Sequence, residues 1–302
     1  MKAAVITAFG DPSVLHEAEV DVPEPAAGQI RVRVQAVGVN PMEGKIRSGA
    51  FDLPLPAVLG FEFAGVVDAM GEGVTGVRVG DRVVGWPDGP VGSYAELTVS
   101  SSYVPIPDAV SFEDAAAVLV AADTASRVLA ELGVRPDETL LVHGASGAVG
   151  SVAVQLAGAL GARVVGTAGA GSLDYVESLG ATAVEYGDDL VERVRAAAPA
   201  GVDAVLDAAG KGALPASIEL RGSTDRIVTI ADPAAADVGV AFSAGTSANR
   251  NLAGVRDALE KLVDGSLAVR IGHTLPLHDA AAAHRLVDSG HPGGKVLLVP
   301  MG

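Results

Sequence analysis

The residues best suited to chemistry form a glycine-rich turn, GASGAVG, at 144–150. An apolar run of strand length (140–142) precedes it and a helical pattern (148–160) follows; Gly161 then ends the helix, and a second apolar run occupies 164–167. Backbone N–H groups in the first turn of a helix lack partners within it, and the helix dipole favours negative charge there. Small residues let a pyrophosphate approach that backbone. The segment therefore predicts one βαβ unit with a pyrophosphate-binding turn.

The match to the three-glycine fingerprint is partial, because Ala145 stands at its first glycine position and leaves AxGxxG. The strand before the turn and the helix after it are the context that supports a dinucleotide site. The alternative is a tight turn that only packs a helix against a sheet. A nucleophile elbow is excluded, since the glycine after Ser146 comes one residue too early for GxSxG.

Composition and charge narrow the class of protein. A chain of 302 residues with 49% hydrophobic content predicts about two domains. The net charge of −16 argues against binding a nucleic-acid backbone or an anionic membrane surface. The absence of cysteine excludes disulfides, thiolate zinc sites and cysteine nucleophiles, and it fits a cytoplasmic protein. No apolar run approaches the ~18 residues of a membrane span, and the N-terminus favours a first strand over a signal peptide.

The elements that must position the turn follow from hydrophobic periodicity. Alternating apolar and polar residues at 30–36 predict a half-buried strand, and frequent glycine turns over 71–92 predict a compact barrel of short strands. From 118 the period becomes helical, through 132. Strands that alternate with helices then predict a parallel, doubly wound sheet. Its further strands are expected at 182–186, 203–206, 226–230 and 238–242, and the tail has helices at 252–263 and 279–288 and a strand at 295–299.

Several separate motifs carry a resemblance to a known family. LVHGASGAVG (141–150) resembles the cofactor turn of the zinc-free quinone oxidoreductases, the zeta-crystallin-like branch of the medium-chain dehydrogenase/reductase superfamily. The resemblance implies an α/β protein with a GroES-like β-barrel catalytic domain at 1–117, completed by 253–302, and a Rossmann domain at 118–252. Other motifs also resemble that family and lie in the expected order along the chain. They are GVNPMEGKIRSG (38–49), LGFEFAGVV (59–67), VRVGDRVVG (77–85), GSYAEL (92–97) and GKVLLVP (294–300).

The resemblance also implies that no zinc is bound. Zinc-dependent relatives place ligands at two of these motifs, where this chain has Asn40 and Phe61. Neither the ligand type nor the ligand number suits a zinc site of that design. The six histidines are scattered without an HxxxH pair, so we expect no metal.

Two residues of the first domain are candidates for catalysis. The resemblance places Asn40 in the active cleft, where its amide could hold the nicotinamide or a substrate oxygen. The alternative role is an N-cap, because Asn before Pro41 is a common helix start. Lys45 lies where relatives carry tyrosine or lysine near the nicotinamide, and its ammonium could stabilise enolate charge. A solvated surface lysine is the alternative.

The cofactor residues are expected along the carboxyl ends of the strands. Backbone groups of the glycine turn would hold the phosphates, and the hydroxyl of Thr124 matches one that relatives aim at the cofactor. Phe242 could equally be a core residue. The predicted set is Thr124, Ser146, Gly147, Ala148, Val149, Gly169, Ser172, Tyr186, Ile230, Ala231 and Phe242.

The end of the second strand of the sheet predicts NADPH as the cofactor. An NAD site usually has an acid there for the ribose 2′-hydroxyl, but this chain reads GTAG at 166–169, and Asp174 comes well into the next helix. Ser172 and Tyr186 can supply hydroxyl donors, although no Lys or Arg lies between Arg163 and Arg193.

We therefore expect an NADPH-dependent, zinc-free reductase of quinones or activated enones, cytoplasmic and, by resemblance, a homodimer. A methyltransferase would also need an acid at the end of the second strand and does not suit the barrel. A non-catalytic NADPH-binding sensor or structural protein remains the alternative function.

Overall fold

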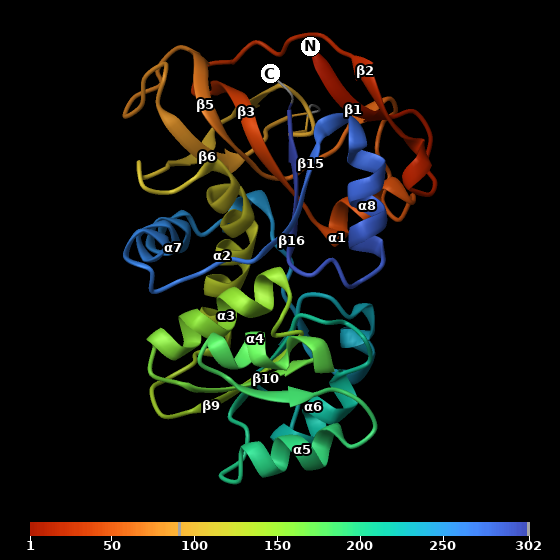
Figure 1. The fold of residues 1–302 in the computed structure, drawn as a ribbon, viewed down its shortest axis with the longest axis vertical. Coiled ribbons are helices and arrows are strands. Elements are labelled where there is room, and N and C mark those ends of the chain that lie inside the picture. The colour runs from red at the N-terminus through yellow and green to blue at the C-terminus, as the bar shows by residue number, and fades with distance from the viewer. Residues whose placement is uncertain (90–91, 301–302) are drawn as a thin grey trace. The chain divides into compact units, whose positions relative to one another are not determined.

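The structure is a computed structural model and describes residues 1–89 and 92–300 (Figure 1). The chain forms two compact units. Unit 1 comprises Met1–Val120, Leu259–Val263 and the chain from Val269 onward, and unit 2 comprises Ala121–Ala258 and Asp264–Ala268. Within the described part of the chain, no helix is both long and apolar enough to cross a bilayer.

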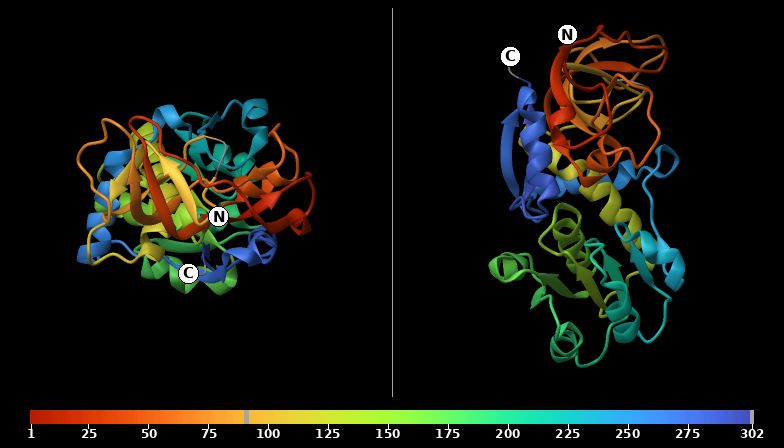
Figure 2. Two further views of the ribbon diagram at one scale, coloured as in Figure 1. Left: turned by 90° about the horizontal axis from the view of Figure 1, so that it is seen from above. Right: turned by 90° about the vertical axis from the view of Figure 1, so that its right-hand side faces the viewer.

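Unit 1 is built around the long strand β3 (Ile30–Val39), which pairs antiparallel with β5, β7 and β16. The red-to-yellow strands curve around a shared interior (Figure 2). Two short helices, α1 (Pro41–Arg47) and α8 (Ala280–Asp288), belong to the same unit. The other strands are β1 (Lys2–Ile6), β2 (Leu15–Glu19), β4 (Ala57–Val58), β5 (Phe63–Met70), β6 (Arg82–Trp86), β7 (Leu97–Ser100), β8 (Ser102–Pro105), β15 (Ile271–Pro276) and β16 (Lys295–Val299).

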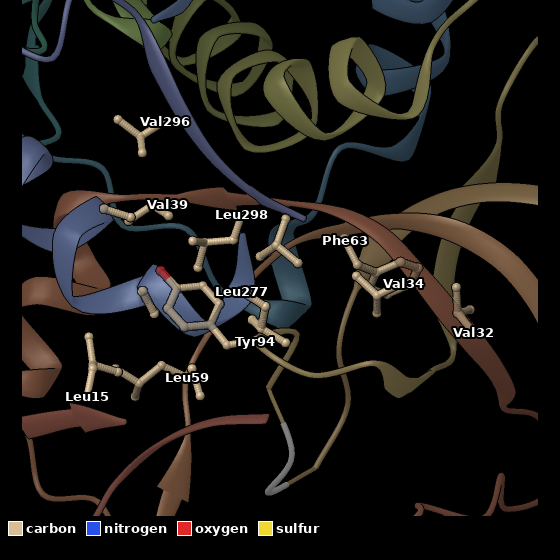
Figure 3. Packing of buried hydrophobic residues seen from close by; sticks show 14 of the residues in the cluster. Leu15, Val32, Val34, Val39, Leu59, Phe63, Tyr94, Leu277, Val296 and Leu298 are labelled. Atoms are coloured by element: carbon tan, nitrogen blue, oxygen red, sulfur yellow. The ribbon is translucent and has the colours of Figure 1, made fainter. Parts of the chain in front are cut away.

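The core of unit 1 combines the N-terminal strands with the C-terminal tail. Alternate residues of β3 are buried over 30–36, as the sequence pattern predicts, and residues 36–39 are all buried. Figure 3 shows the Tyr94 ring among Leu59, Leu277 and Leu298, with its hydroxyl turned toward the blue helix α8. The tail therefore completes the hydrophobic core of the barrel rather than forming a separate element.

Unit 2 holds a parallel sheet in the order β11-β10-β9-β12-β13-β14. This order reverses between β9 and β12, as in a Rossmann fold, so the carboxyl ends of those strands border the expected crevice. The strands are β9 (Thr139–His143), β10 (Arg163–Ala168), β11 (Thr182–Glu185), β12 (Ala204–Asp207), β13 (Ile227–Thr229) and β14 (Ala241–Phe242). The helices are α3 (Ala148–Ala159), α4 (Leu173–Ser178), α5 (Leu190–Ala197) and α6 (Leu214–Arg221), while α7 (Leu252–Asp264) and α2 (Phe112–Leu132) each contribute to both units.

The predicted fold class is confirmed, because a barrel-like, mostly antiparallel sheet and a doubly wound parallel sheet occupy successive parts of the chain. The start of α2 was wrong in the sequence prediction. The helix begins at Phe112 rather than 118, because the Ser111 hydroxyl accepts from Asp114 N (2.9 Å) and caps it. The expected boundary between 117 and 118 consequently falls inside a continuous helix.

The last strand of the parallel sheet is also shorter than predicted. Residues Pro233–Val238 form a 3-10 helix that ends at Gly239 in a left-handed conformation (φ +70°). Only Ala241–Phe242 remain to pair with β13. A proline at the helix start and a glycine at its end produce this local helix, which the apolar spacing alone did not reveal.

Candidate functional site

In unit 2, the predicted turn joins β9 to α3 in a conformation that needs its glycines. Gly144 has φ +74°, a region that favours glycine. A Cβ on Gly150 would lie 2.1 Å from the Gly144 carbonyl oxygen, so no side chain fits there. Gly147 N donates to Gly144 O (3.0 Å), and Gly147 caps α3 with an extended backbone. The backbone of the turn is thus folded tightly against the start of the helix.

The start of α3 offers the features that a pyrophosphate requires. The first N–H groups of a helix lack intrahelical partners, and they carry the positive end of the dipole. Gly147 is exposed, and Ser146, Ala148 and Val149 are each partly exposed. These four residues therefore fit the phosphates of a dinucleotide.

The end of β10 brings three of the predicted cofactor residues together. Ser172 N donates to Gly169 O (2.8 Å) at the start of a short 3-10 helix. A Cβ on Gly169 would lie 3.1 Å from the Tyr186 hydroxyl, which places that hydroxyl beside the strand end. Tyr186 is 53% exposed, so its ring is accessible to a ligand.

The positions of the charged side chains near the end of β10 could not be predicted from sequence spacing. Glu185 ends β11 and pairs in register with Ala168 of β10, so an acid lies one strand away. The Arg193 guanidinium reaches back from α5 and donates to the Glu185 carbonyl (2.8 Å), while also pairing with Asp189 at 3.6 Å. A cation thus lies nearer to the strand end than its position in the sequence suggested.

The remaining predicted residues of unit 2 lie on separate elements. Thr124 is buried in α2. Ile230 and Ala231 directly follow β13, where a Cβ on Gly210 would lie 2.6 Å from the Ala231 carbonyl carbon. Phe242 ends β14 and is 48% exposed, which excludes its alternative role as a core residue.

His143, at the end of β9, ties neighbouring elements together. Its Nδ1 lies 3.2 Å from Thr167 Oγ1 on β10, and its Nε2 lies 3.1 Å from Ser217 Oγ on α6. Burial lowers the pKa of His143 to about 4, although Asp207 opposes the shift. A neutral ring with both nitrogens engaged has a structural role here.

In unit 1, Asn40 lies between the end of β3 and Pro41, the first residue of α1. Its backbone N–H donates to Glu43 Oε2 (3.0 Å), one arm of a capping box. Asn40 therefore marks the helix start, as its alternative role implied. Its side-chain amide also makes hydrogen bonds to side chains from other parts of unit 1.

The Asn40 amide is bound on both of its polar atoms. Nδ2 donates to Glu43 Oε1 (3.2 Å) and to Glu62 Oε1 (2.9 Å). Oδ1 accepts from Lys295 Nζ at 2.6 Å. The amide orientation follows from chemistry, because the Lys295 ammonium has only donors and the Glu62 carboxylate has only acceptors.

Glu62 and Lys295 form a buried ion pair, with Nζ and Oε1 2.6 Å apart and side-chain exposures of 0% and 4%. The second oxygen of Glu62 accepts from Val120 N (3.0 Å) in α2. Removing one partner of such a pair leaves an uncompensated buried charge, which typically costs about 3–5 kcal/mol. The pair is therefore a strong local constraint on Asn40.

Gly38 makes room for the ion pair. A Cβ at this position would lie 2.0 Å from Glu62 Oε1 and 2.5 Å from Lys295 Cε. The strand β3 thus needs glycine here, not for its dihedral angles but for the close approach of two charged side chains.

Glu43 is a second buried carboxyl beside the same ammonium. Burial raises the pKa of Glu43 to about 7, with Glu62 adding to the rise and Lys295 opposing it. Glu43 Oε1 also accepts from Phe61 N (3.3 Å). Near neutral pH, the site therefore holds one ion pair and one carboxyl that is partly protonated.

A second chain of polar groups lies behind α1. The Tyr94 hydroxyl is 3.1 Å from His284 Nε2, and His284 Nδ1 is 3.0 Å from Arg47 Nη1. Arg47 Nη2 donates to Asp288 (2.9 Å). Burial, reinforced by Arg47, lowers the pKa of His284 to about 4. These contacts join α1 to α8 through neutral imidazole.

The lysine beside Asn40 is therefore Lys295, whereas Lys45 is exposed on α1. Across residues 1–89 and 92–300, the Lys45 ammonium makes no hydrogen bond or ion pair. Sequence reasoning missed Glu43, Glu62 and Lys295. The available signal was an acid within the apolar motif LGFEFAGVV and a lysine that opens an apolar strand.

The donor set of this site does not fit zinc. The Asn40 amide is already engaged by Lys295 and two carboxylates, and the Phe61 side chain has no ligand atom. In the described part of the chain, no group of three or more His, Cys, Asp or Glu could hold a metal ion.

Two family models match successive parts of the chain. Residues 26–108 match the alcohol dehydrogenase GroES-like domain, and residues 148–257 match the zinc-binding dehydrogenase family. The first model covers most of the strands of unit 1, and the second covers the parallel sheet from α3 onward.

Relatives and solved structures extend this similarity. A quinone oxidoreductase from Pseudomonas aeruginosa is 41% identical over 160 residues, 52% of this chain and 49% of its own. The chain thus spans about half the length of the curated relatives it matches. An NAD-dependent alcohol dehydrogenase structure is similar over 100% of both chains (TM-score 0.89, 32% identity). Escherichia coli quinone oxidoreductase complexed with NADPH has TM-score 0.89 at 28% identity, covering 99% of this chain and 100% of its own.

Proposed function

The chain belongs to the quinone oxidoreductases of the medium-chain dehydrogenase/reductase superfamily, and from this membership we propose that it is an NADPH-dependent, zinc-free reductase of quinones or activated enones. The observation that carries the proposal is the glycine turn at the start of α3, where Gly150 packs on Gly144 and leaves the backbone of 146–149 accessible. This is the cradle that a dinucleotide pyrophosphate needs.

When bound, NADPH supplies a hydride to an electrophilic carbon of the substrate. The protein's contribution is binding, orientation and charge stabilisation. The turn residues hold the phosphates, while Thr124, Ile230, Ala231 and Phe242 contact the rest of the cofactor. Their positions support these roles: Thr124 lies on α2, Ile230 and Ala231 directly follow β13, and Phe242 ends β14.

We assign the 2′-phosphate of NADPH to the end of β10. Gly169, Ser172 and Tyr186 lie together there, and two of them carry hydroxyl groups. Residues 166–169 contain no acid that could accept a hydrogen bond from the ribose 2′-hydroxyl of NADH, although Glu185 lies on the neighbouring strand. A modest preference for NADPH over NADH is therefore expected.

Asn40 and Lys45 are the proposed catalytic residues. Asn40 orients the reacting groups, and Lys45 stands exposed on α1, where it can face negative charge on a bound substrate. Without a Lewis acid, oxidation of simple alcohols is disfavoured. A conjugated acceptor that spreads its own negative charge suits such a site better.

The deciding experiment is a panel of quinones and enones assayed for NADPH oxidation, with and without a chelator. We expect turnover of at least one acceptor, unaffected by the chelator, and well under one zinc per chain by elemental analysis. Tight NADPH binding without turnover of any acceptor would instead favour a non-catalytic NADPH-binding protein.

Assembly and location complete the proposal. We expect a cytoplasmic homodimer that acts on a small molecule and binds neither nucleic acid nor membrane. The −16 net charge supports the last two points. Light scattering of the purified protein measures the mass of the assembly against the 30.1 kDa chain.

A further inference from the structure

Arg127 carries a buried guanidinium with unused hydrogen-bond donors. Its side chain lies in α2 and is only 8% exposed. Nη1 donates to Ser243 Oγ and lies 3.5 Å from Glu131 Oε1. A guanidinium has five N–H groups, yet within residues 1–89 and 92–300 neither Nε nor Nη2 has a hydrogen-bond acceptor. Because a buried donor without an acceptor is costly, these N–H groups need a partner that the described chain does not supply.

Hydrogen bonds hold this guanidinium at the carboxyl edge of the parallel sheet. Ser243 directly follows β14, and its backbone N–H donates to the carbonyl of Thr229, the last residue of β13 (2.9 Å). The Ser243 hydroxyl accepts from Arg127 and donates to Glu131 Oε1 (2.9 Å). These side chains all belong to unit 2. They fix the guanidinium at the edge where a doubly wound sheet binds its ligand.

The segment that follows this point, 244–249, leaves the guanidinium within reach of a ligand. The segment is exposed, and Asn249 closes it on itself by accepting from Thr246 N (2.7 Å). A Cβ on Gly245 would lie 3.5 Å from Arg127 Nη2, so this N–H group lies beside an exposed glycine rather than under a side chain.

The strand order indicates which half of a dinucleotide lies beside Arg127. A Rossmann sheet binds a dinucleotide across the reversal of strand order, with one nucleotide at each half of the sheet. We assign the 2′-phosphate, and with it the adenosine, to the end of β10. The nicotinamide nucleotide then lies at the other half, which contains β12, β13 and β14 and holds the guanidinium. The neutral oxygen acceptors of that nucleotide are the carboxamide carbonyl and the ribose hydroxyls.

We propose that Arg127 binds the cofactor by donating a hydrogen bond to a neutral oxygen of the nicotinamide nucleoside. This inference rests on the proposed function and adds a residue to its binding site. Thr124 lies three positions earlier in α2, so the two side chains share one face of the helix. Ser243 and Glu131 are positioning residues, because they hold the guanidinium at the edge of the sheet.

The first test separates the two halves of the cofactor. Calorimetry measures Kd for NADPH and for adenosine 2′,5′-bisphosphate, which lacks the nicotinamide half, in wild type, Arg127→Met and Arg195→Met. Arg195 forms an exposed ion pair with Glu219 (2.8 Å) in the same unit and supplies the matched control. In Arg127→Met we expect Kd for NADPH to rise about 10-fold while Kd for the bisphosphate is unchanged. The control should leave the ratio of the two constants as in wild type.

Two results of this test would overturn the proposal. If Arg127 only supports the fold, both dissociation constants rise together in Arg127→Met. If water alone satisfies the buried N–H groups, Kd for NADPH is the same in Arg127→Met as in wild type.

The second test uses the wild-type protein, so it does not depend on the folding of a variant. NMR measures the exchange of the Arg127 guanidinium N–H protons with water, after assignment through the backbone. We expect exchange to slow about 10-fold with saturating NADPH and to stay unchanged with saturating bisphosphate. NADPH binding that leaves this exchange unchanged would overturn the inference alone, whereas a protein that binds neither ligand would defeat the proposed function itself.

Discussion

At the scale of single residues, the site of unit 1 is dominated by the buried charged groups around Asn40. Two carboxyl groups, Glu43 and Glu62, share one ammonium, Lys295, and all three side chains are buried. Both carboxylates cannot be compensated by one cation at low cost. Burial raises the pKa of Glu43 to about 7 and Glu62 adds to the rise, so protonation of Glu43 relieves the imbalance.

This pKa predicts the pH dependence of stability. Between pH 4.5 and about 7, the folded protein retains a proton on Glu43 that the unfolded chain has released, so stability falls as pH rises through this window. The contribution is of order 3 kcal/mol. Glu43→Gln should remove it, as measured by urea unfolding at pH 5 and pH 8. Glu72→Gln, at an exposed position, serves as control, and a pH slope equal to that of wild type in Glu43→Gln would refute the assignment.

Gly38 provides a steric test of the same cluster. A methyl group at this position would overlap Glu62 Oε1 and Lys295 Cε, so Gly38→Ala should separate the pair and destabilise the protein by about 3 kcal/mol. Thermal unfolding measures the loss. Gly158→Ala is the matched control, because an added Cβ there meets no atom within 4 Å. Equal melting temperatures for the two variants would show that the pair tolerates displacement.

At the scale of elements, the ends of β10 and β11 decide which cofactor is preferred. Their parallel register places Glu185 beside Ala168, while Tyr186 reaches Gly169 and Arg193 folds back to Glu185. Hydroxyl groups and a cation favour a 2′-phosphate, whereas Glu185 opposes it. These opposing charges explain why only a modest preference is expected.

A carboxylate placed at this strand end should reverse the preference. Ala170 begins the 3-10 helix that follows Gly169 and is exposed, so Ala170→Asp adds a negative charge without burying it. We expect kcat/KM for NADPH to fall about 10-fold while that for NADH holds or rises, because a 2′-phosphate would be repelled. Ala170→Asn separates charge from size. A preference for NADH in the unmodified enzyme would show that Glu185 dominates.

At the scale of the whole molecule, the described residues include a buried neutral histidine in each unit, His284 in unit 1 and His143 in unit 2. Both have a pKa lowered from 6.5 to about 4. Between these values the unfolded chain binds more protons than the folded protein, so stability is lost as pH falls from 6.5 to 4.

Acid should therefore destabilise both units. Each histidine contributes a loss of about 3 kcal/mol, and two such losses outweigh the opposite effect of Glu43 in the overlapping window. His143→Gln and His284→Gln should each flatten the acid side of the stability profile, as measured by urea unfolding from pH 4 to 7. Exposed His291 supplies the control, His291→Gln. An unchanged profile in both buried variants would mean that other groups set the acid limit.

The features that depend on neighbouring residues could be predicted from the sequence. The strand, glycine turn and helix around Ser146 follow from local spacing, because a turn that packs Gly150 on Gly144 has few backbone solutions. The start of α1 at Asn40 and Pro41 is local for the same reason. Fold class followed as well, since alternating strands and helices have one common arrangement.

The surroundings of Asn40 depend on contacts between residues that are far apart in the chain. Lys295 and Glu62 are separated by 233 positions in the chain, and their contact depends on the register of β16 against β3 and on the space beside Gly38. The family resemblance pointed to Lys45, which is near Asn40 in the chain and lies exposed on α1. Charges meet in a folded protein through strand pairing and burial, and neither is encoded by the distance between residues along the chain.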